Sequence, residues 1–227
     1  MTIAIAHRGE PVGHRENTLD AFAAAVVLGA DMVEIDLRCT RDGQIVVLHD
    51  PTLERLWGTD RSVGDMDLVE VLAVGDGTDG GRIPIFAEVL EAVPAPLMVD
   101  FTKRNVVEGA VREVMAAGPE ALARCLFVTG NVPALRLLRE ASPVARIGLT
   151  WMEEELPSAA LLEELGAEFW NPWFERVSPE AVAAMHEMGL KVSCWTVDEP
   201  DDMSRMVAAR VDAVVSNRIA DLVAFLG

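Results

Sequence analysis

The sequence predicts an α/β protein that forms one (β/α)8 barrel domain over residues 1–227, and two observations lead to this fold class. Short β-branched runs alternate with amphipathic stretches along the whole chain, which is the pattern of repeated βα units around a parallel sheet. The chain has 227 residues, slightly fewer than the roughly 250 that are usual for eight such units. An open, doubly wound sheet is the alternative architecture for the same alternation of elements.

Nine segments have the length and composition of β-strands. They are residues 3–6, 32–37, 45–48, 97–101, 126–129, 146–150, 168–171, 192–197 and 213–216. Only 7 residues separate Leu37 from Ile45, whereas a parallel crossover needs about a dozen, and Asp42-Gly43 favours a hairpin turn. We therefore expect residues 45–48 to form an extra hairpin strand, which leaves eight parallel strands.

Helices are expected between the strands, because capping residues begin the amphipathic stretches and glycines end them. A helix should run from Asn17 or Thr18 to Gly29, and others over 105–118, 158–166 and 178–189. Further helices are expected over 85–93, 133–140, 201–209 and 218–226. Residues 50–84 fit no regular element. A loop of that length in a compact chain is usually functional, so we expect an active-site loop there.

The composition indicates a folded and strongly acidic protein. Hydrophobic residues make up 51% of the chain, and 19 Lys and Arg face 37 Asp and Glu, a net charge of −18. This charge repels nucleic-acid phosphates and anionic membranes, so neither is an expected partner. No apolar run approaches the roughly 18 residues of a membrane span, and no signal peptide is recognisable. We expect a cytoplasmic protein whose three cysteines, Cys39, Cys125 and Cys194, are buried thiols.

Acidic residues lie where two of the expected strands end, and functional groups of (β/α)8 barrels collect at these ends. Glu34 and Asp36 are two residues apart and therefore share one face of a strand, and Asp100 ends the neighbouring strand. Three carboxylates in one place repel each other unless a cation neutralises them, and oxygen donors favour Mg²⁺ or Ca²⁺. The alternative is a structural role, with the carboxylates paired to Arg8 and Arg38.

Two histidines also lie at the ends of expected strands, His7 after the first and His49 after the hairpin strand. Imidazoles titrate near neutral pH, so one can accept a proton while the other supplies one in the cleavage of an ester. A structural role is the alternative for each, but the neighbouring Arg8 and the acidic cluster favour catalysis.

The order and spacing of several motifs resemble the glycerophosphodiester phosphodiesterase family. The motifs are His7-Arg8-Gly9, Glu16-Asn17-Thr18-Leu19-Asp20-Ala21-Phe22, Gly29-Ala30-Asp31 leading into Glu34-x-Asp36, Thr40-Arg41-Asp42-Gly43, His49-Asp50-Pro51-Thr52-Leu53, Pro84 to Leu90, Trp195-Thr196-Val197 and Val211-Asp212-Ala213.

The resemblance implies a TIM barrel that hydrolyses glycerophosphodiesters, small-molecule substrates, to sn-glycerol 3-phosphate and an alcohol. The residues that match the family's site are Glu34, Asp36 and Asp100 as ligands of Mg²⁺ or Ca²⁺, His7 and His49 as the acid/base pair, Arg8 as a phosphate ligand, and Glu16 and Asn17 as supporting residues. Trp195, at a strand end, is a candidate apolar wall for the glycerol carbons, with ordinary core packing as the alternative.

The sequence departs from the family pattern at one strand end in particular. Where the family has Glu-x-Lys, this chain has Asp100-Phe101-Thr102, followed by Lys103. Thr102 cannot supply the charge of the lysine, which predicts weaker phosphate binding. Lys103 is a candidate phosphate ligand only if a bulge turns it inward, since strand alternation points it away. The chain also has Arg15 where the family usually has proline, and ends its last strand with Ser216-Asn217 in place of Thr-Asp.

Other functions follow from the same residues. Asp100 is similar to its counterpart in sphingomyelinase D-type phospholipases, and Leu56 and Trp57 could form an apolar rim for a lysophospholipid. The altered Asp100 and Thr102 would also suit a catalytically silent barrel that binds a phosphodiester. A glycosidase ranks last, because Glu34 and Asp36 share one strand. The residues identify neither the alcohol group of the substrate nor an oligomeric state.

Overall fold

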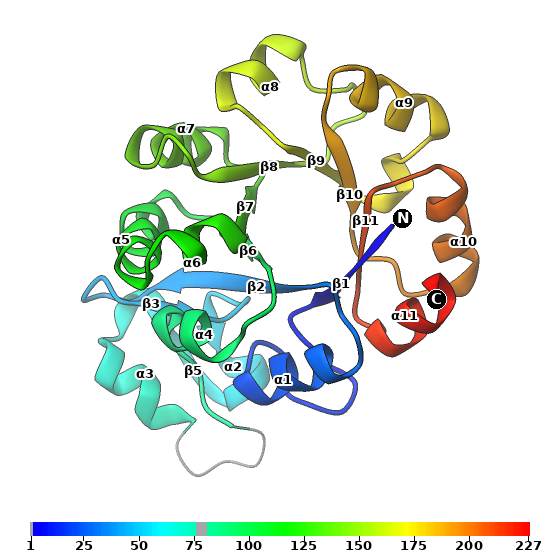
Figure 1. Cartoon of the computed structure of the whole chain (residues 1–227). Helices are drawn as coiled ribbons and strands as arrows, with labels where there is room; N and C mark the ends of the chain where they lie inside the picture. The colour runs from blue at the N-terminus through cyan, green and yellow to red at the C-terminus, as the bar shows by residue number, and fades with distance from the viewer. Residues whose placement is uncertain (1, 76–80) are drawn as a thin grey trace.

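The computed structural model describes residues 2–75 and 81–227, and its central sheet is a closed barrel (Figure 1). The eight parallel strands are β1 (Ile3–His7), β2 (Met32–Cys39), β6 (Leu97–Asp100), β7 (Cys125–Thr129), β8 (Arg146–Trp151), β9 (Phe169–Pro172), β10 (Lys191–Cys194) and β11 (Ala213–Ser216). β1 pairs with both β2 and β11, which closes the ring. The predicted barrel is therefore confirmed, and the open sheet is excluded.

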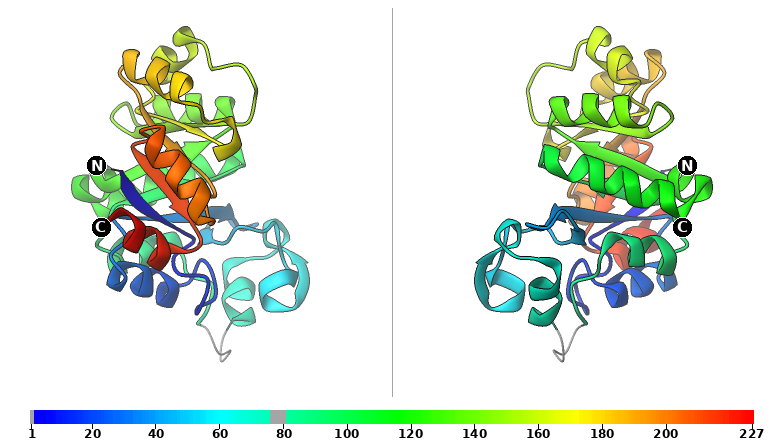
Figure 2. Two further views of the ribbon diagram at one scale, coloured as in Figure 1. Left: turned by 90° about the vertical axis from the view of Figure 1, so that its right-hand side faces the viewer. Right: turned by 90° about the vertical axis from the view of Figure 1, so that its left-hand side faces the viewer.

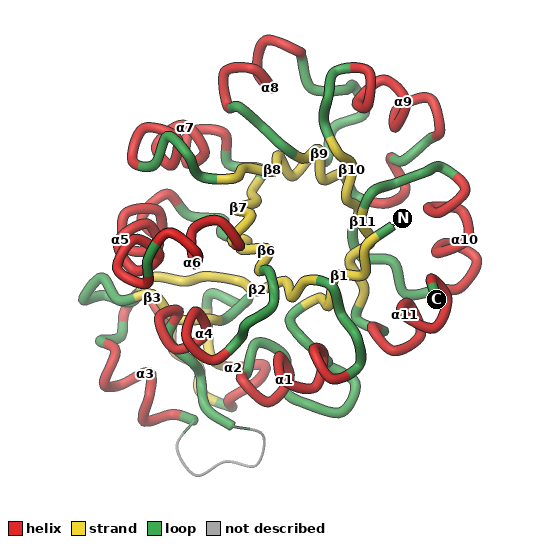
Figure 3. The backbone as a smooth tube through the Cα atoms, viewed as in Figure 1, coloured by secondary structure: helices red, strands yellow, loops and turns green. Residues whose placement is uncertain are grey.

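Helices surround the ring of strands (Figure 3). They are α1 (Leu19–Val27), α4 (Phe86–Ala92), α5 (Val107–Ala117), α6 (Pro119–Arg124), α7 (Val132–Ala141), α8 (Ala159–Leu165), α9 (Pro179–Glu187), α10 (Pro200–Ala208) and α11 (Ile219–Leu226), with 3-10 turns η2 (Arg104–Val106) and η3 (Phe174–Arg176). The side chains of Thr18, Ser158 and Ser178 cap their helices as expected. The short helix α6 was not predicted, because Gly118 ends α5 and Pro119 starts a second helix at once. No helix of the described ranges is long and apolar enough to cross a membrane.

The inside of the barrel changes from apolar to polar along the strands. A small cluster inside the ring includes Ile5, Met32, Met98 and Val215. Side chains of one strand alternate between its two faces, so Glu34 and Asp36 follow Met32 on the inner face of β2, and Asp100 follows Met98 on β6. The larger apolar cluster lies between strands and helices. The acidic side chains of β2 and β6 thus lie toward the carboxyl ends of these strands.

The hairpin strand β3 (Ile45–Val47) pairs antiparallel with β2, as the short link predicted. The expectation of an irregular loop over residues 50–84 is wrong. The segment contains β4 (Thr52–Leu53), α2 (Glu54–Trp57), β5 (Thr59–Ser62), η1 (Val63–Asp65) and α3 (Leu68–Val74). These elements are too short for a recognisable hydrophobic period, which is why the sequence did not show them. Part of the glycine-rich run, residues 76–80, lies outside the described residues.

This segment, here called the insertion, packs on the hairpin strand β3 around a separate apolar cluster. Five buried residues of the insertion, Leu53, Val63, Met66, Val71 and Ile83, form this cluster with Val46 of β3 and Leu48 directly after it. Figure 2 shows the insertion projecting from the barrel on the side opposite the N terminus. The parallel strands run from the side of the N terminus toward this side. The insertion therefore lies beside the strand ends that carry the polar residues.

Candidate active site

Glu34, Asp36 and Asp100 meet inside the carboxyl end of the barrel. The register of β2 against β6 places Asp36 directly beside Asp100. One carboxylate oxygen from each of the three residues lies within 4.8 Å of the others. Glu34 and Asp36 are almost fully buried, at 4% and 8% exposure. The acidic cluster expected from the sequence therefore exists in the fold.

The electrostatics of this cluster suit a divalent cation. Burial and the charge of Asp36 raise the pKa of Glu34 well above its usual range. The same two causes raise the pKa of Asp100 to about 7. Desolvated carboxylates that repel each other are hard oxygen donors in need of a counter-charge, which is the ligand chemistry of Mg²⁺ and Ca²⁺. The three residues thus fit such an ion.

The alternative role of these carboxylates was structural pairing with Arg8 and Arg38. Of these two arginines, Arg8 contacts them and Arg38 does not. Arg8 Nε lies 3.1 Å from Asp36 Oδ2, and the Arg8 backbone N–H donates to Glu34 Oε2 at 3.0 Å. Arg38 instead donates from Nε and Nη2 to the backbone carbonyl of His49, and from Nη1 to Thr102 Oγ1. Arg8 alone does not balance three carboxylates.

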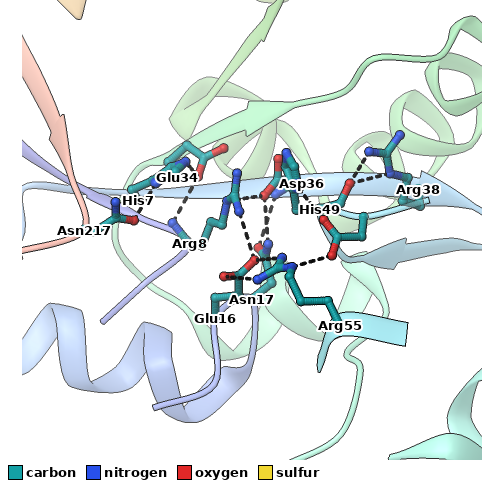
Figure 4. Close-up of polar contacts among 11 residues, drawn as sticks. His7, Arg8, Glu16, Asn17, Glu34, Asp36, Arg38, His49, Arg55 and Asn217 are labelled. Atoms are coloured by element: carbon teal, nitrogen blue, oxygen red, sulfur yellow. Dashed lines mark hydrogen bonds and ion pairs between the residues drawn. The ribbon is translucent and has the colours of Figure 1, made fainter. Parts of the chain in front are cut away.

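His7 ends β1 and is held through one ring nitrogen (Figure 4). Asn217 donates its side-chain N–H to Asp198 Oδ2 at 2.8 Å, which turns Asn217 Oδ1 toward His7 Nδ1 at 2.7 Å. Since that oxygen can only accept, Nδ1 carries the proton and Nε2 is left with a lone pair. His7 Nε2 lies 3.9 Å from Glu34 Oε2. Burial and the charge of Arg8 lower the pKa of His7, which favours the neutral ring.

His49 follows β3 and is held by an acidic neighbour. Its Nδ1 lies 2.7 Å from Asp50 Oδ1, and Arg55 from α2 donates to Asp50 Oδ2 at 2.5 Å. The hydrogen bond from Arg55 lowers the pKa of Asp50 to about 2, so Asp50 is an anion at neutral pH. Asp50 thereby fixes the orientation of the His49 ring, whose side chain is 42% exposed.

The loop between β1 and α1 carries Arg8, Glu16 and Asn17. Arg8 Nη1 donates to Glu16 Oε1 at 2.9 Å, and Asn17 donates to Asp36 Oδ2 at 2.8 Å. Burial raises the pKa of Glu16, but Arg55 and Arg8 outweigh it and keep the pKa below its usual value. The turn depends on Gly9, whose φ is +88° and whose added Cβ would lie 2.7 Å from the carbonyl carbon of Ala21.

A cavity of about 290 Å³ opens among these groups. Its lining includes His7, Arg8, Glu34, Asp36, His49, Asp100, Thr102, Met152, Asn171 and Trp195. Trp195, expected inside a strand, lies just beyond β10 and donates to the Asn171 carbonyl at 3.1 Å. The predicted site residues of the barrel wall therefore come together around one space.

Three residues considered from the sequence do not line the cavity, and for Lys103 this is the position that strand alternation without a bulge predicts. Lys103 does not line it, because alternation after Asp100 turns Thr102 inward and leaves Lys103 exposed beside η2. Leu56 and Trp57 do not form its rim either, because the Trp57 ring packs under the Arg15 guanidinium at 4.2 Å. Met152, 53% exposed, supplies an apolar edge in their place.

Sequence reasoning missed the positions that four residues take in holding the site together. Asp50 orients His49, Arg55 joins Asp50 to Glu16, Asn217 orients His7, and Arg38 joins His49 to Thr102. Asp50 and Asn217 follow strand ends, which is a usable signal. Arg55 lies in a four-residue helix, where an arginine looks like any surface charge.

Comparisons with known proteins agree with this geometry. The sequence pattern of the "Glycerophosphoryl diester phosphodiesterase family" matches residues 7–221. A glycerophosphodiester phosphodiesterase of Caldanaerobacter subterraneus subsp. tengcongensis is 30% identical over 95% of this chain and 94% of its own length. The lysophospholipase D GDPD1 of Rattus norvegicus is 28% identical over 86% of this chain and 68% of its own length.

Solved structures share the fold. An Oleispira antarctica phosphodiesterase, in complex with the product sn-glycerol-3-phosphate, has a TM-score of 0.89 at 22% identity, covering 100% of this chain and 97% of that one. The glycerophosphodiester phosphodiesterase of Thermotoga maritima has a TM-score of 0.85 at 24% identity, covering 99% and 98%. With the family pattern matched from residue 7 to residue 221, the chain belongs to the glycerophosphoryl diester phosphodiesterase family, a family of phosphoric diester hydrolases.

Proposed function

We propose that this chain hydrolyses glycerophosphodiesters to sn-glycerol 3-phosphate and an alcohol, with a divalent cation and two histidines at the carboxyl end of the barrel. The observation that carries the proposal is the joint placement of His7, His49 and the three carboxylates around one cavity. Family membership supplies the substrate class.

Glu34, Asp36 and Asp100 would hold the cation, Mg²⁺ or Ca²⁺. A bound divalent cation supplies positive charge that stabilises the negative charge developing on phosphate oxygens. Arg8 lines the same cavity, and its guanidinium is fixed by Glu16 and Asp36. A fixed guanidinium suits a phosphate oxygen, because its donors form a planar fork. Arg8 therefore binds the phosphate group of the substrate.

The hydrogen bonds of the two histidines suggest different roles. His7 keeps Nε2 unprotonated, so it accepts the proton of the glycerol hydroxyl group next to the phosphate as the oxygen of that group bonds to phosphorus. The phosphorus–oxygen bond to the alcohol breaks, and His49, held at Nδ1 by Asp50, donates a proton to the departing alkoxide. Water then opens the cyclic phosphate, with the two proton transfers reversed, and this gives sn-glycerol 3-phosphate. Trp195 offers an apolar wall to the carbon atoms of the glycerol.

A second candidate reaction is the cleavage of lysophospholipids between phosphate and head group. The exposed Met152 at the cavity edge favours it, because an acyl chain needs apolar contact outside the cavity. The similarity to a lysophospholipase D points the same way.

A product assay separates these reactions. The protein, with Mg²⁺ or with Ca²⁺, would be incubated with glycerophosphocholine and with lysophosphatidylcholine. We expect sn-glycerol 3-phosphate from the former, loss of activity in Asp36→Asn, and normal activity in Glu164→Gln, a control in an exposed ion pair with Arg136. Lysophosphatidate as the main product would favour the second reaction. An Asp36→Asn variant as active as the wild type would contradict both.

A further inference from the structure

The lysine that the family pattern places just after β6 is missing from this chain, but the neighbouring strand β2 carries an arginine, Arg38, close to the same place. Thr102 stands where the family pattern has lysine, and it lines the cavity. The guanidinium of Arg38 reaches it from β2, with Nη1 donating to Thr102 Oγ1 at 2.8 Å. A positive charge thus lies directly beside the position that has lost one.

Arg38 is held in this place by the other side of the cavity wall. Its Nε donates to the His49 carbonyl oxygen at 2.8 Å, and Nη2 donates to the same oxygen. His49 and Thr102, the two residues it contacts, both line the cavity. Two fixed contacts on one planar guanidinium leave its charge little freedom to move away.

The hydroxyl of Thr102 is oriented by this contact. Because Oγ1 accepts the N–H of Arg38, its own proton points toward another acceptor, away from the guanidinium. The adjacent positive charge also makes the hydroxyl a stronger donor. A phosphate oxygen in the cavity would be such an acceptor.

We propose that Arg38 and Thr102 together replace the family's lysine as the second cationic contact to the substrate phosphate, Thr102 as the donor and Arg38 as the charge behind it. This inference rests on the proposed phosphodiesterase function. It replaces the expectation that the chain lacks a cation at this strand end. It also leaves Lys103 without a role in phosphate binding.

The competing reading is that Arg38 only positions His49 through the backbone carbonyl. The two readings differ in what they change. A phosphate contact affects KM and product binding, whereas a displaced His49 lowers kcat. A lysine at position 102 would rescue the first defect and not the second.

The test combines turnover of glycerophosphocholine with calorimetric binding of sn-glycerol 3-phosphate, which needs no turnover. Thr102→Val and Arg38→Met should each weaken product binding and raise KM by about 10-fold, the usual size for a hydrogen bond to a charged group. The double variant Arg38→Met/Thr102→Val should lose little more than either single variant, because the two residues act as a unit. Arg38→Met/Thr102→Lys should recover most of the loss.

Arg41→Met is the matched control. Arg41 lies on the same hairpin but pairs with Asp67 and Glu70 at the surface. Its loss should therefore change neither KM nor the affinity for sn-glycerol 3-phosphate. Equal product binding by wild type, Arg38→Met and Thr102→Val, in a wild type that hydrolyses glycerophosphocholine, would overturn this inference alone. So would a fall in kcat in Arg38→Met without rescue by lysine. A wild type that neither hydrolyses glycerophosphocholine nor binds the product would overturn the proposed function and this inference with it.

Discussion

His7 and His49 reach the cavity from β1 and from the end of β3, and each holds a protein partner at Nδ1. Replacing either by alanine should lower kcat by roughly 10²- to 10⁴-fold, the usual range for general acid–base catalysis. The double variant should lose far less than the product of the single losses, because the two rings serve one reaction. Steady-state kinetics measure this, with His186→Ala as the control, since His186 pairs with Asp212 at the surface. A near-normal rate in either single variant would refute the assignment.

Asp100 gives the metal-free protein a pH dependence of stability. Burial and Asp36 raise the pKa of Asp100 to about 7 in the folded chain, against 3.8 ordinarily. Between these values the unfolded chain releases the proton and the folded chain keeps it, so the free energy of unfolding falls as pH rises and levels off above pH 7. We expect a fall of about 1 to 4 kcal/mol, since one pKa unit corresponds to about 1.4 kcal/mol and access through the cavity weakens the effect.

The proposed divalent cation should oppose this fall in stability, because it would bind the deprotonated carboxylates. Urea unfolding with chelator and with Mg²⁺ or Ca²⁺ should show little stabilisation by the ion at pH 5 and a clear one at pH 8. Asp100→Asn should reduce the dependence of the metal-free protein without abolishing it, because the raised pKa of Glu34 acts in the same direction and the lowered pKa of His7 acts in the opposite one. Equal stabilisation by the ion at both values would argue against the acidic cluster as the metal site.

Most residues that line the cavity could be predicted from the sequence. The residues that hold them in place through hydrogen bonds could not. Strand alternation and residue chemistry identify Glu34, Asp36 and Asp100, and turn Thr102 inward in place of Lys103. Arg38 was considered only as an ion-pair partner of the carboxylates. Its actual contacts, the His49 carbonyl and Thr102 Oγ1, depend on where the hairpin ends relative to β6. Distances across strands of this kind do not follow from spacing along the chain.

Among the elements, the insertion and the β1–α1 loop meet at Arg55. Arg55 in α2 donates to Glu16 Oε1 at 2.6 Å and to Asp50 Oδ2 at 2.5 Å, so one side chain supports both Arg8 and His49 (Figure 4). Arg55→Met should lower kcat/KM by about 10-fold or more through loss of orientation. Global stability should change by less than about 1 kcal/mol, because the side chain is half-exposed.

Hydrogen exchange of the insertion, measured beside kcat/KM, tests this role of Arg55. Exchange in residues 52–65 should accelerate in Arg55→Met while the barrel strands are unaffected. Arg61→Met, which removes an ion pair with Glu70 inside the insertion, should leave kcat/KM unchanged. Unchanged kcat/KM in Arg55→Met would show that catalysis does not depend on the contacts of Arg55 with Glu16 and Asp50.

The sequence predicted the long elements well and the insertion poorly. The hairpin strand β3 followed from a link too short for a crossover, and the eight parallel strands from their β-branched runs. Within the insertion, β4 has 2 residues and α2 has 4, so no period of 2.0 or 3.6 residues can be read. Its stability comes from the buried cluster around Leu53 and Val71, and such a tertiary cluster is invisible in a local pattern.

At the scale of the whole molecule, closure of the barrel builds the site from distant parts of the chain. β1 pairs with β11, which brings Asn217 to His7 across 210 positions of sequence. The net charge of −18 repels a phosphodiester anion overall, so the proposed function requires local attraction from the proposed cation, Arg8 and Arg38 at the end of the ring. Arg8 lines the cavity, and Arg38 contacts Thr102 in its wall.

The central claim is that the barrel hydrolyses a phosphodiester with a cation held by Glu34, Asp36 and Asp100. The most direct test is the rate of sn-glycerol 3-phosphate release from glycerophosphocholine by exhaustively chelated protein, measured while Mg²⁺ or Ca²⁺ is added back. The three uncompensated carboxylates predict negligible release without the ion and saturable recovery with it. Full release by the chelated, folded protein, or none at any concentration of either ion, would contradict the account.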